Sequence, residues 1–239
     1  MSIITPKMVN NRSADSPGSC VFFMPFTEGS GTTYSDVVGD ISVADDNAGG
    51  WTTNAHCAEA KVSGAADSGT FPTIPAGKSI IFITVDIIGV GGSALSNTSI
   101  GAVSQDAYGV SNTGGFSVNT GLTTAITAAY TAGANGEKQI RVGTYNGATG
   151  LLSSYSAVDG AALAADNTTD GSTLVGIAID PTTDNFLIGS SINDSYAYGV
   201  ALYIVDTLPS DAVLIEAGNW VYKNWTNGVK GLPPQLATY

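Results

Sequence analysis

Apolar residues in this chain come in short runs separated by turn-forming residues, a pattern typical of many short β-strands. The run Ser79 to Gly89 is β-branched almost throughout, so it predicts a central strand covered on both faces, with Asp86 turned to a rim or a loop amide. Cys20 to Phe26 is a shorter strand, and Pro25 predicts either a sheet edge or the end of the strand. Tyr198 to Val205 predicts a strand near the end of the chain.

Two hairpins are predicted in the second half of the chain. Residues 138–145 alternate between apolar and polar types, which predicts a half-exposed strand with Gln139 and Arg141 facing solvent. The dipeptide Asn146-Gly147 follows directly and favours a type I′ turn. Residues 174–188 predict a second hairpin, with its turn at residues 181–184.

One helix is predicted after the last strand. Ser210 is placed to cap free backbone amides, and Asp211 meets the positive end of the helix dipole. Asn227-Gly228 ends the helix, and Pro233-Pro234 prevents it from resuming. The following residues form one apolar stripe and are expected to anchor the helix on the core: Val213, Ala217, Trp220, Val221 and Trp225.

These elements predict an all-β fold, a two-sheet antiparallel jelly-roll sandwich with one short C-terminal helix. Turn signals recur about every eight to twelve residues, which suits a sandwich of short strands. The predicted organisation is an N-terminal arm at 1–19, the jelly-roll domain at 20–232 and a C-terminal tail at 233–239.

Charge narrows the range of partners. The formal net charge is −12 and the eight cations do not cluster, so we expect no nucleic-acid partner. A neutral or basic protein surface, or an uncharged glycan, fits better. No apolar window is long enough to span a membrane, and the N-terminus lacks a signal-peptide pattern, so assembly in a cytoplasm is expected. Cys20 and Cys57 are interpreted as buried thiols.

The sequence offers little for catalysis. Hydrolases of β-sandwich type need two carboxylates close together, whereas the glutamates lie far apart in the sequence. They are Glu28, Glu59, Glu137 and Glu216. His56 is the only histidine, and its neighbour Cys57 would point to the opposite face of an extended segment. We therefore predict no catalytic residues, no enzymatic activity and no cofactor.

Two ligand classes stay open. Aspartates at 45–47 and at 166–170 supply the hard oxygen ligands that calcium prefers, although neither segment has EF-hand spacing. Aromatic rings form platforms for sugars when they are exposed. The candidate glycan contacts are Trp51, Tyr108, Tyr145 and Tyr155, with Tyr130, Tyr196 and Tyr198 as further rings of the same kind.

Both ends of the domain resemble a known family. The segment Glu28-Gly29-Ser30-Gly31, followed by Asp36 to Asp40, resembles the opening of concanavalin A-like, laminin-G-like jelly rolls. The strand VALYIVDT followed by LPSDAV resembles the close of that family. Residues 224–234, with Trp225 and a Gly-Lys, Pro-rich ending, resemble bacteriophage virion proteins built on this domain.

This resemblance implies a non-enzymatic virion structural protein, assembled in the host cytoplasm, that decorates or cements the outer surface of the capsid head. Its expected partners are the major capsid protein and further copies of itself. The arm would attach it through its apolar residues, which are Ile3, Ile4, Met8 and Val9. One alternative is a carbohydrate- or receptor-binding module of a tail fibre or spike, and another is a glycoside hydrolase.

Overall fold

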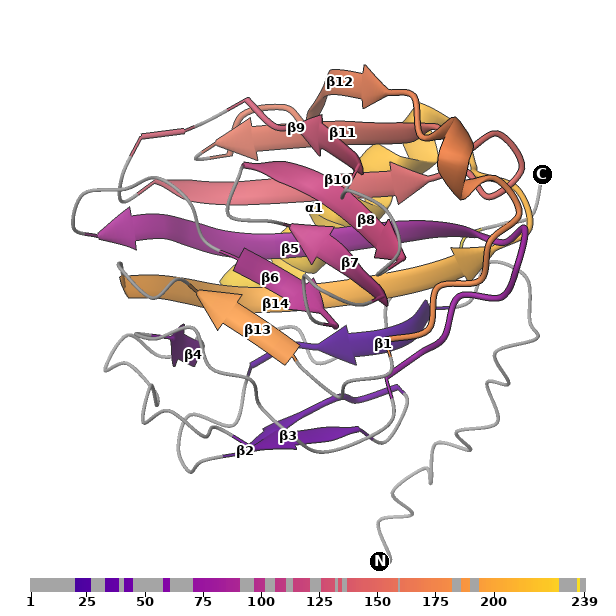
Figure 1. Ribbon diagram of the computed structural model, residues 1–239. Helices are drawn as coiled ribbons and strands as arrows, with labels where there is room; N and C mark the ends of the chain where they lie inside the picture. The colour runs from indigo at the N-terminus through magenta and orange to yellow at the C-terminus, as the bar shows by residue number, and fades with distance from the viewer. Residues whose placement is uncertain are drawn as a thin grey trace, which may run out of the picture.

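The computed structural model describes residues 20–26, 33–38, 41–44, 58–60, 71–90, 97–101, 106–110, 114–120, 126–131, 133–134, 137–158, 160–181, 186–189, 194–227 and 236. They form an all-β sandwich of two antiparallel sheets with one C-terminal helix, as predicted (Figure 1). Within these residues, no helix combines the length and the hydrophobicity needed to cross a bilayer.

The larger sheet has seven strands in the order β1-β14-β5-β10-β11-β12, with β4 also paired to β14. Its strands are β1 (Cys20–Met24), β4 (Ala58–Ala60), β5 (Ser79–Val90), β10 (Lys138–Tyr145), β11 (Leu152–Val158), β12 (Ala164–Thr169) and β14 (Asp194–Val205). The predicted edge strand and the predicted central strand are therefore confirmed as β1 and β5.

The smaller sheet has five strands in the order β13-β6-β7-β8-β9. They are β6 (Asn97–Ile100), β7 (Asp106–Val110), β8 (Gly115–Thr120), β9 (Ile126–Ala129) and β13 (Phe186–Gly189). A separate pair joins β2 (Thr33–Ser35) to β3 (Ser42–Ala44), and a 3₁₀ turn, η1, spans Ser172–Leu174. In Figure 1 the smaller sheet lies in front of the larger one, and the helix lies behind it.

Strand β5 separates two apolar cores because its side chains alternate between the faces of the large sheet. Ile80 and Phe82 pack between the two sheets, where Phe82 stacks on Phe116 with ring centroids 6.5 Å apart. Ile81 and Ile83 pack on the opposite face, against the helix. The unbroken β-branched sequence of β5 follows from this burial on both sides.

Helix α1 (Asp211–Asn227) begins where the sequence predicts. The carbonyl of Ser210 accepts hydrogen bonds from the amides of Val213 and Leu214, at 2.9 and 3.1 Å. Ala217 and Val221 are buried against the large sheet, and Trp220 contacts Phe23 edge to face at 5.6 Å. Leu236 joins the same core, so this residue of the predicted tail packs with the domain.

Both outer strands of the large sheet are held by hydrogen bonds to other parts of the chain, through the backbone at β1 and through a side chain at β12. At β1, Phe23 donates its amide to the Asp36 carboxylate (2.8 Å), and its carbonyl accepts from Val37 (2.9 Å). At the other edge, Thr169 of β12 donates to the carbonyl of Thr127 in the smaller sheet (3.0 Å), and β12 lies beside β9 (Figure 1). Edge strands that are held in this way are poor templates for pairing with another chain.

Three predictions of local structure are wrong. The loop after β10 is longer than a type I′ turn, because Asn146 donates to the carbonyl of Leu151 and left-handed backbone occurs at Gly150 instead. Residues 174–188 form no hairpin: Ile179 bridges Ile74, and β13 pairs with β6. The third wrong prediction placed Gln139 and Arg141 of β10 in solvent and Asp86 of β5 at a rim or a loop amide, whereas all three side chains are buried.

Candidate functional site

A buried ion pair lies between the two sheets, on the face of β5 and β10 that the polar residues share. Arg141 of β10 donates to the carboxylate of Asp86 of β5, and the side chains are 3% and 2% exposed. Asp86 was expected at a rim, and Arg141 and Gln139 were expected in solvent. All three are buried because the smaller sheet covers the face that the alternating pattern assigns to water.

Residues beyond β9 cover this pair. The guanidinium of Arg141 lies over the ring of Tyr130, 5.7 Å from its centroid, in a cation–π contact. Thr131 donates a hydrogen bond to the carboxylate of Asp166 in β12. Burial, and then the charge of Asp166, raise the pKa of Tyr130 well above its ordinary value, so its phenol is neutral. Burial lowers the pKa of Arg141 to about 9, which leaves it a cation at neutral pH.

Glu137 and Gln139 lie near the Asp86–Arg141 pair, at the start of β10. The Glu137 carboxylate accepts from the amide of Ala134 at 2.5 Å. A β-carbon on Gly133 would lie 2.6 Å from Nε2 of Gln139 and 2.9 Å from Oε2 of Glu137, so the ends of both side chains lie close to this glycine. In the sheet register Gln139 pairs with Asp86, so the start of β10 lies beside the ion pair.

Some polar atoms around this pair are buried without a hydrogen-bond partner, among them Oγ1 of Thr84, Nε2 of Gln139, the hydroxyl of Tyr130 and Oδ2 of Asp166. Carboxylates, a tyrosine and an arginine are residue types used in acid–base chemistry. Here, however, Asp86 and Arg141 are closed off from solvent, so a substrate cannot reach them in this arrangement. The ion pair joins the neighbouring strands β5 and β10 of the larger sheet, and the contact of Arg141 with Tyr130 links it to the end of β9.

Three of the four predicted glycan contacts lie among the described residues, and all three are buried. Tyr108 donates to the carbonyl of Pro72 (2.7 Å), Tyr145 to that of Leu174, and Tyr155 to the Asp211 carboxylate (2.9 Å). All three rings are buried in the core, so they cannot form an exposed platform for a sugar. They were selected by residue type, and sequence alone does not separate core rings from exposed ones.

Several other predicted residues lie outside the described residues, or their side chains do. They are Ile3, Ile4, Met8, Val9, Trp51, Cys57, the aspartates at 45–46, and the side chains of Tyr196, Tyr198 and Trp225. Cys20 is buried, as predicted, and its thiol donates to the carbonyl of Phe22 at 3.1 Å.

The second calcium candidate lies on β12 and just after it. Asp166 is bonded to Thr131, and the carboxylate of Asp170 accepts from the amide of Ser172 at 2.9 Å. In the part of the chain that the structure describes, no three His, Cys, Asp or Glu side chains are grouped so as to hold a metal ion.

The hydrogen bond between Tyr155 and Asp211 predicts a pH dependence of stability. Burial, reinforced by this bond, raises the pKa of Tyr155 to about 12, whereas a tyrosine in the unfolded chain ionises near pH 10. The contribution is complete below about pH 10 and is lost as the pH rises towards 12. We expect Tyr155→Phe to weaken this decline, measured by urea unfolding between pH 8 and 11.5. Tyr222→Phe is the control, and an unchanged slope for Tyr155→Phe would contradict the prediction.

No protein-family model and no curated protein matches the chain. Solved structures do match, at low identity. Trypanosoma rangeli sialidase in complex with sialic acid is 14% identical with a TM-score of 0.47, and the match covers 84% of this chain and 32% of the sialidase. The GH43 protein BlXynB from Bacillus licheniformis is 8% identical with a TM-score of 0.44, over 76% of this chain and 39% of that protein.

A lectin-like protein also matches. Arcelin-5 from Phaseolus vulgaris is 8% identical with a TM-score of 0.37, over 77% of this chain and 96% of arcelin-5. The chain spans about a third of the length of the sialidases. At these identities the likeness concerns the fold, and lectin-like and sialidase-type β-sandwiches are consistent with a concanavalin A-like jelly roll.

The prediction that the chain is not an enzyme is contradicted by the sialidase and GH43 matches, and we withdraw it. Its reasoning had a physical weakness, because it required carboxylates close together in sequence. The sheet register instead places Asp86 next to Gln139, two residues from Glu137. Separation along the chain therefore does not measure separation in a sheet.

Proposed function

We propose that this chain is a structural protein of a bacteriophage particle and that it decorates the outer surface of the capsid head. The observation that carries the proposal is that both outer strands of the large sheet are held by other parts of the chain. Asp36 and Val37 bond to the backbone of Phe23 in β1, and the side chain of Thr169 ties β12 to the smaller sheet. A domain held in many copies on a lattice needs this protection, because free sheet edges associate when they are crowded.

The sequence supplies the connection to a virion. Residues 224–234 resemble the ending of bacteriophage virion proteins of this fold, and the net charge of −12 suits a surface facing away from packaged DNA. The alternative, a carbohydrate- or receptor-binding module of a tail fibre or spike, has less support because Tyr108, Tyr145 and Tyr155 are buried. The proposed partner is the major capsid protein.

The test is the number of copies on purified particles. The proposal predicts that the chain copurifies with intact particles in hundreds of copies, as measured by quantitative mass spectrometry. A handful of copies would favour the tail-fibre alternative, and absence from particles would refute a virion role.

The arm can be tested on the same particles. We expect replacement of Ile3, Ile4, Met8 and Val9 by serine to lower occupancy at least about tenfold, which corresponds to a loss of only about 1.4 kcal/mol of binding free energy. Asn10→Ser with Asn11→Ser is the matched control in the same segment. Occupancy that is unchanged by the apolar replacements would remove the arm from the proposal.

A further inference from the structure

One end of the sandwich presents two exposed apolar side chains on neighbouring loops. Leu151, in the loop after β10, is 40% exposed, and Val175, just after η1, is 45% exposed. Among the described residues, one other large apolar side chain is as exposed: Val37, at 39%, beside β1. Isolated exposed residues are ordinary, but these two stand on loops that are hydrogen-bonded to each other.

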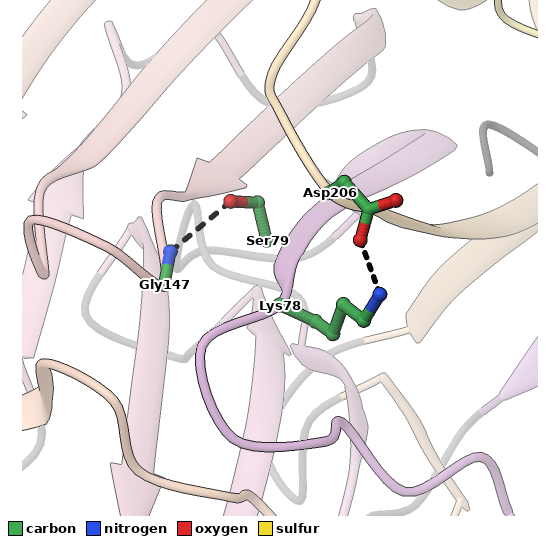
Figure 2. Close-up of polar contacts among 4 residues, drawn as sticks. All are labelled: Lys78, Ser79, Gly147 and Asp206. Carbon is green, nitrogen blue, oxygen red and sulfur yellow. Dashed lines mark hydrogen bonds and ion pairs between the residues drawn. The ribbon is translucent and has the colours of Figure 1, made fainter. Parts of the chain in front are cut away.

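These two loops are held together firmly. The amide of Gly176 donates to the carbonyl of Gly147 at 3.0 Å. Gly150 has φ +76°, and a β-carbon there would lie 2.2 Å from the carbonyl oxygen of Gly171, so only glycine allows the approach. Figure 2 shows that the amide of Gly147 also donates to the hydroxyl of Ser79, at 3.1 Å, which joins this loop to the start of β5.

The polar groups of the first loop are bonded within it. The side-chain oxygen of Asn146 accepts from the amides of Ala148 and Thr149, at 3.0 and 3.2 Å. The amide of Leu151 donates to the hydroxyl of Thr149 at 3.3 Å. Since these bonds already fix the loop, docking there costs little conformational entropy.

The charges of the segments at this end are mostly negative. Lys78 pairs with Asp206 (Figure 2). The carboxylates of Asp170 and Asp180 accept hydrogen bonds from the amide of Ser172 and the hydroxyl of Thr73, both neutral donors, so these bonds do not cancel their charge. A second copy of the chain would bring the same carboxylates to a self-contact, and like charges oppose it. A partner with an apolar recess and a basic rim is complementary in both respects.

We propose that Leu151 and Val175 form an attachment surface for the capsid shell protein, through a site on that protein that is apolar at its centre and basic at its rim. This inference rests on the proposed virion function and adds a contact to that of the arm. Because part of the attraction is electrostatic, added salt should release the chain from particles more readily.

The test measures occupancy of particles by Leu151→Ser, Val175→Ser and the double variant, with Val37→Ser as the matched control for loss of an equally exposed apolar group. We expect the double variant to lose at least about tenfold in occupancy and the control to keep the wild-type level. Thermal unfolding of each purified variant checks that the domain is intact. If the double variant is unstable, the occupancy of particles by each single variant decides the test.

Each outcome bears on a different statement. Wild-type occupancy of the double variant, or of both single variants if the double one unfolds, would overturn the attachment surface while the virion role stands. An equal loss in Val37→Ser would overturn it too, because the effect would not be specific to this end. Absence of the wild-type chain from particles would overturn both proposals.

Discussion

Replacing Arg141 with methionine should lower the free energy of unfolding by about 3–5 kcal/mol. The arginine is paired with Asp86 between the sheets, where both side chains are almost fully buried. Removing one partner leaves a buried carboxylate without its counter-charge, which is far more costly than losing an exposed ion pair. Urea unfolding measures the loss directly, and the melting temperature should fall by about 2–4 °C for each kcal/mol.

The control is the double replacement of Asp86→Leu with Arg141→Met. An apolar pair of similar volume removes both charges together, so the double variant should recover most of the stability that Arg141→Met loses. Lys78→Met, which breaks the exposed pair with Asp206, should change stability by no more than about 1 kcal/mol. A double variant as unstable as Arg141→Met would show that the ion pair is not the cause.

Gly143→Val should destabilise the domain by about 3 kcal/mol, the upper end of the usual cost of overpacking. Gly143 is on β10, facing the smaller sheet, and a β-carbon there would lie 2.1 Å from two ring carbons of Phe116. The ring cannot withdraw easily, because it also stacks on Phe82. The glycine therefore sets how closely the two sheets approach, and thermal and urea unfolding measure what that approach contributes.

A double-mutant cycle separates this clash from a general weakness of the strand. Phe116→Ala alone should cost about 3–5 kcal/mol, because it leaves a cavity between the sheets. Combined with Gly143→Val, the loss should be well below the sum of the two single losses, since the valine occupies part of that cavity. Strict additivity would mean that residue 143 and the ring do not compete for the same space.

Much of the fold follows from the sequence, because local patterns report local structure. The β-branched run of β5, the position of Pro25 just after β1 and Ser210 just before α1 were each sufficient to place an element. Local sequence did not predict which distant strands pair. In residues 174–188 the turn-forming residues favour a hairpin, yet β13 pairs with β6. That pairing depends on contacts far apart in the chain, which local patterns do not record.

The buried polar cluster was less predictable than the fold. Period-two alternation correctly places Gln139 and Arg141 on one face of β10, and Ile140 and Val142 on the other. It cannot tell what covers each face, so the polar face was assigned to solvent. The residues that meet there come from β5, β10, β12 and the end of β9, and no spacing in the sequence relates them.

The sequence by itself determined the type and order of the main elements: short strands, a central β-branched strand and one capped helix at the C-terminus. Only the tertiary structure decided which polar groups are buried, that Tyr108, Tyr145 and Tyr155 belong to the core, and that both outer strands of the large sheet are held by other parts of the chain. The physical reason is that backbone preference and side-chain alternation act over a few residues, whereas burial depends on a second sheet or a helix packing on a face.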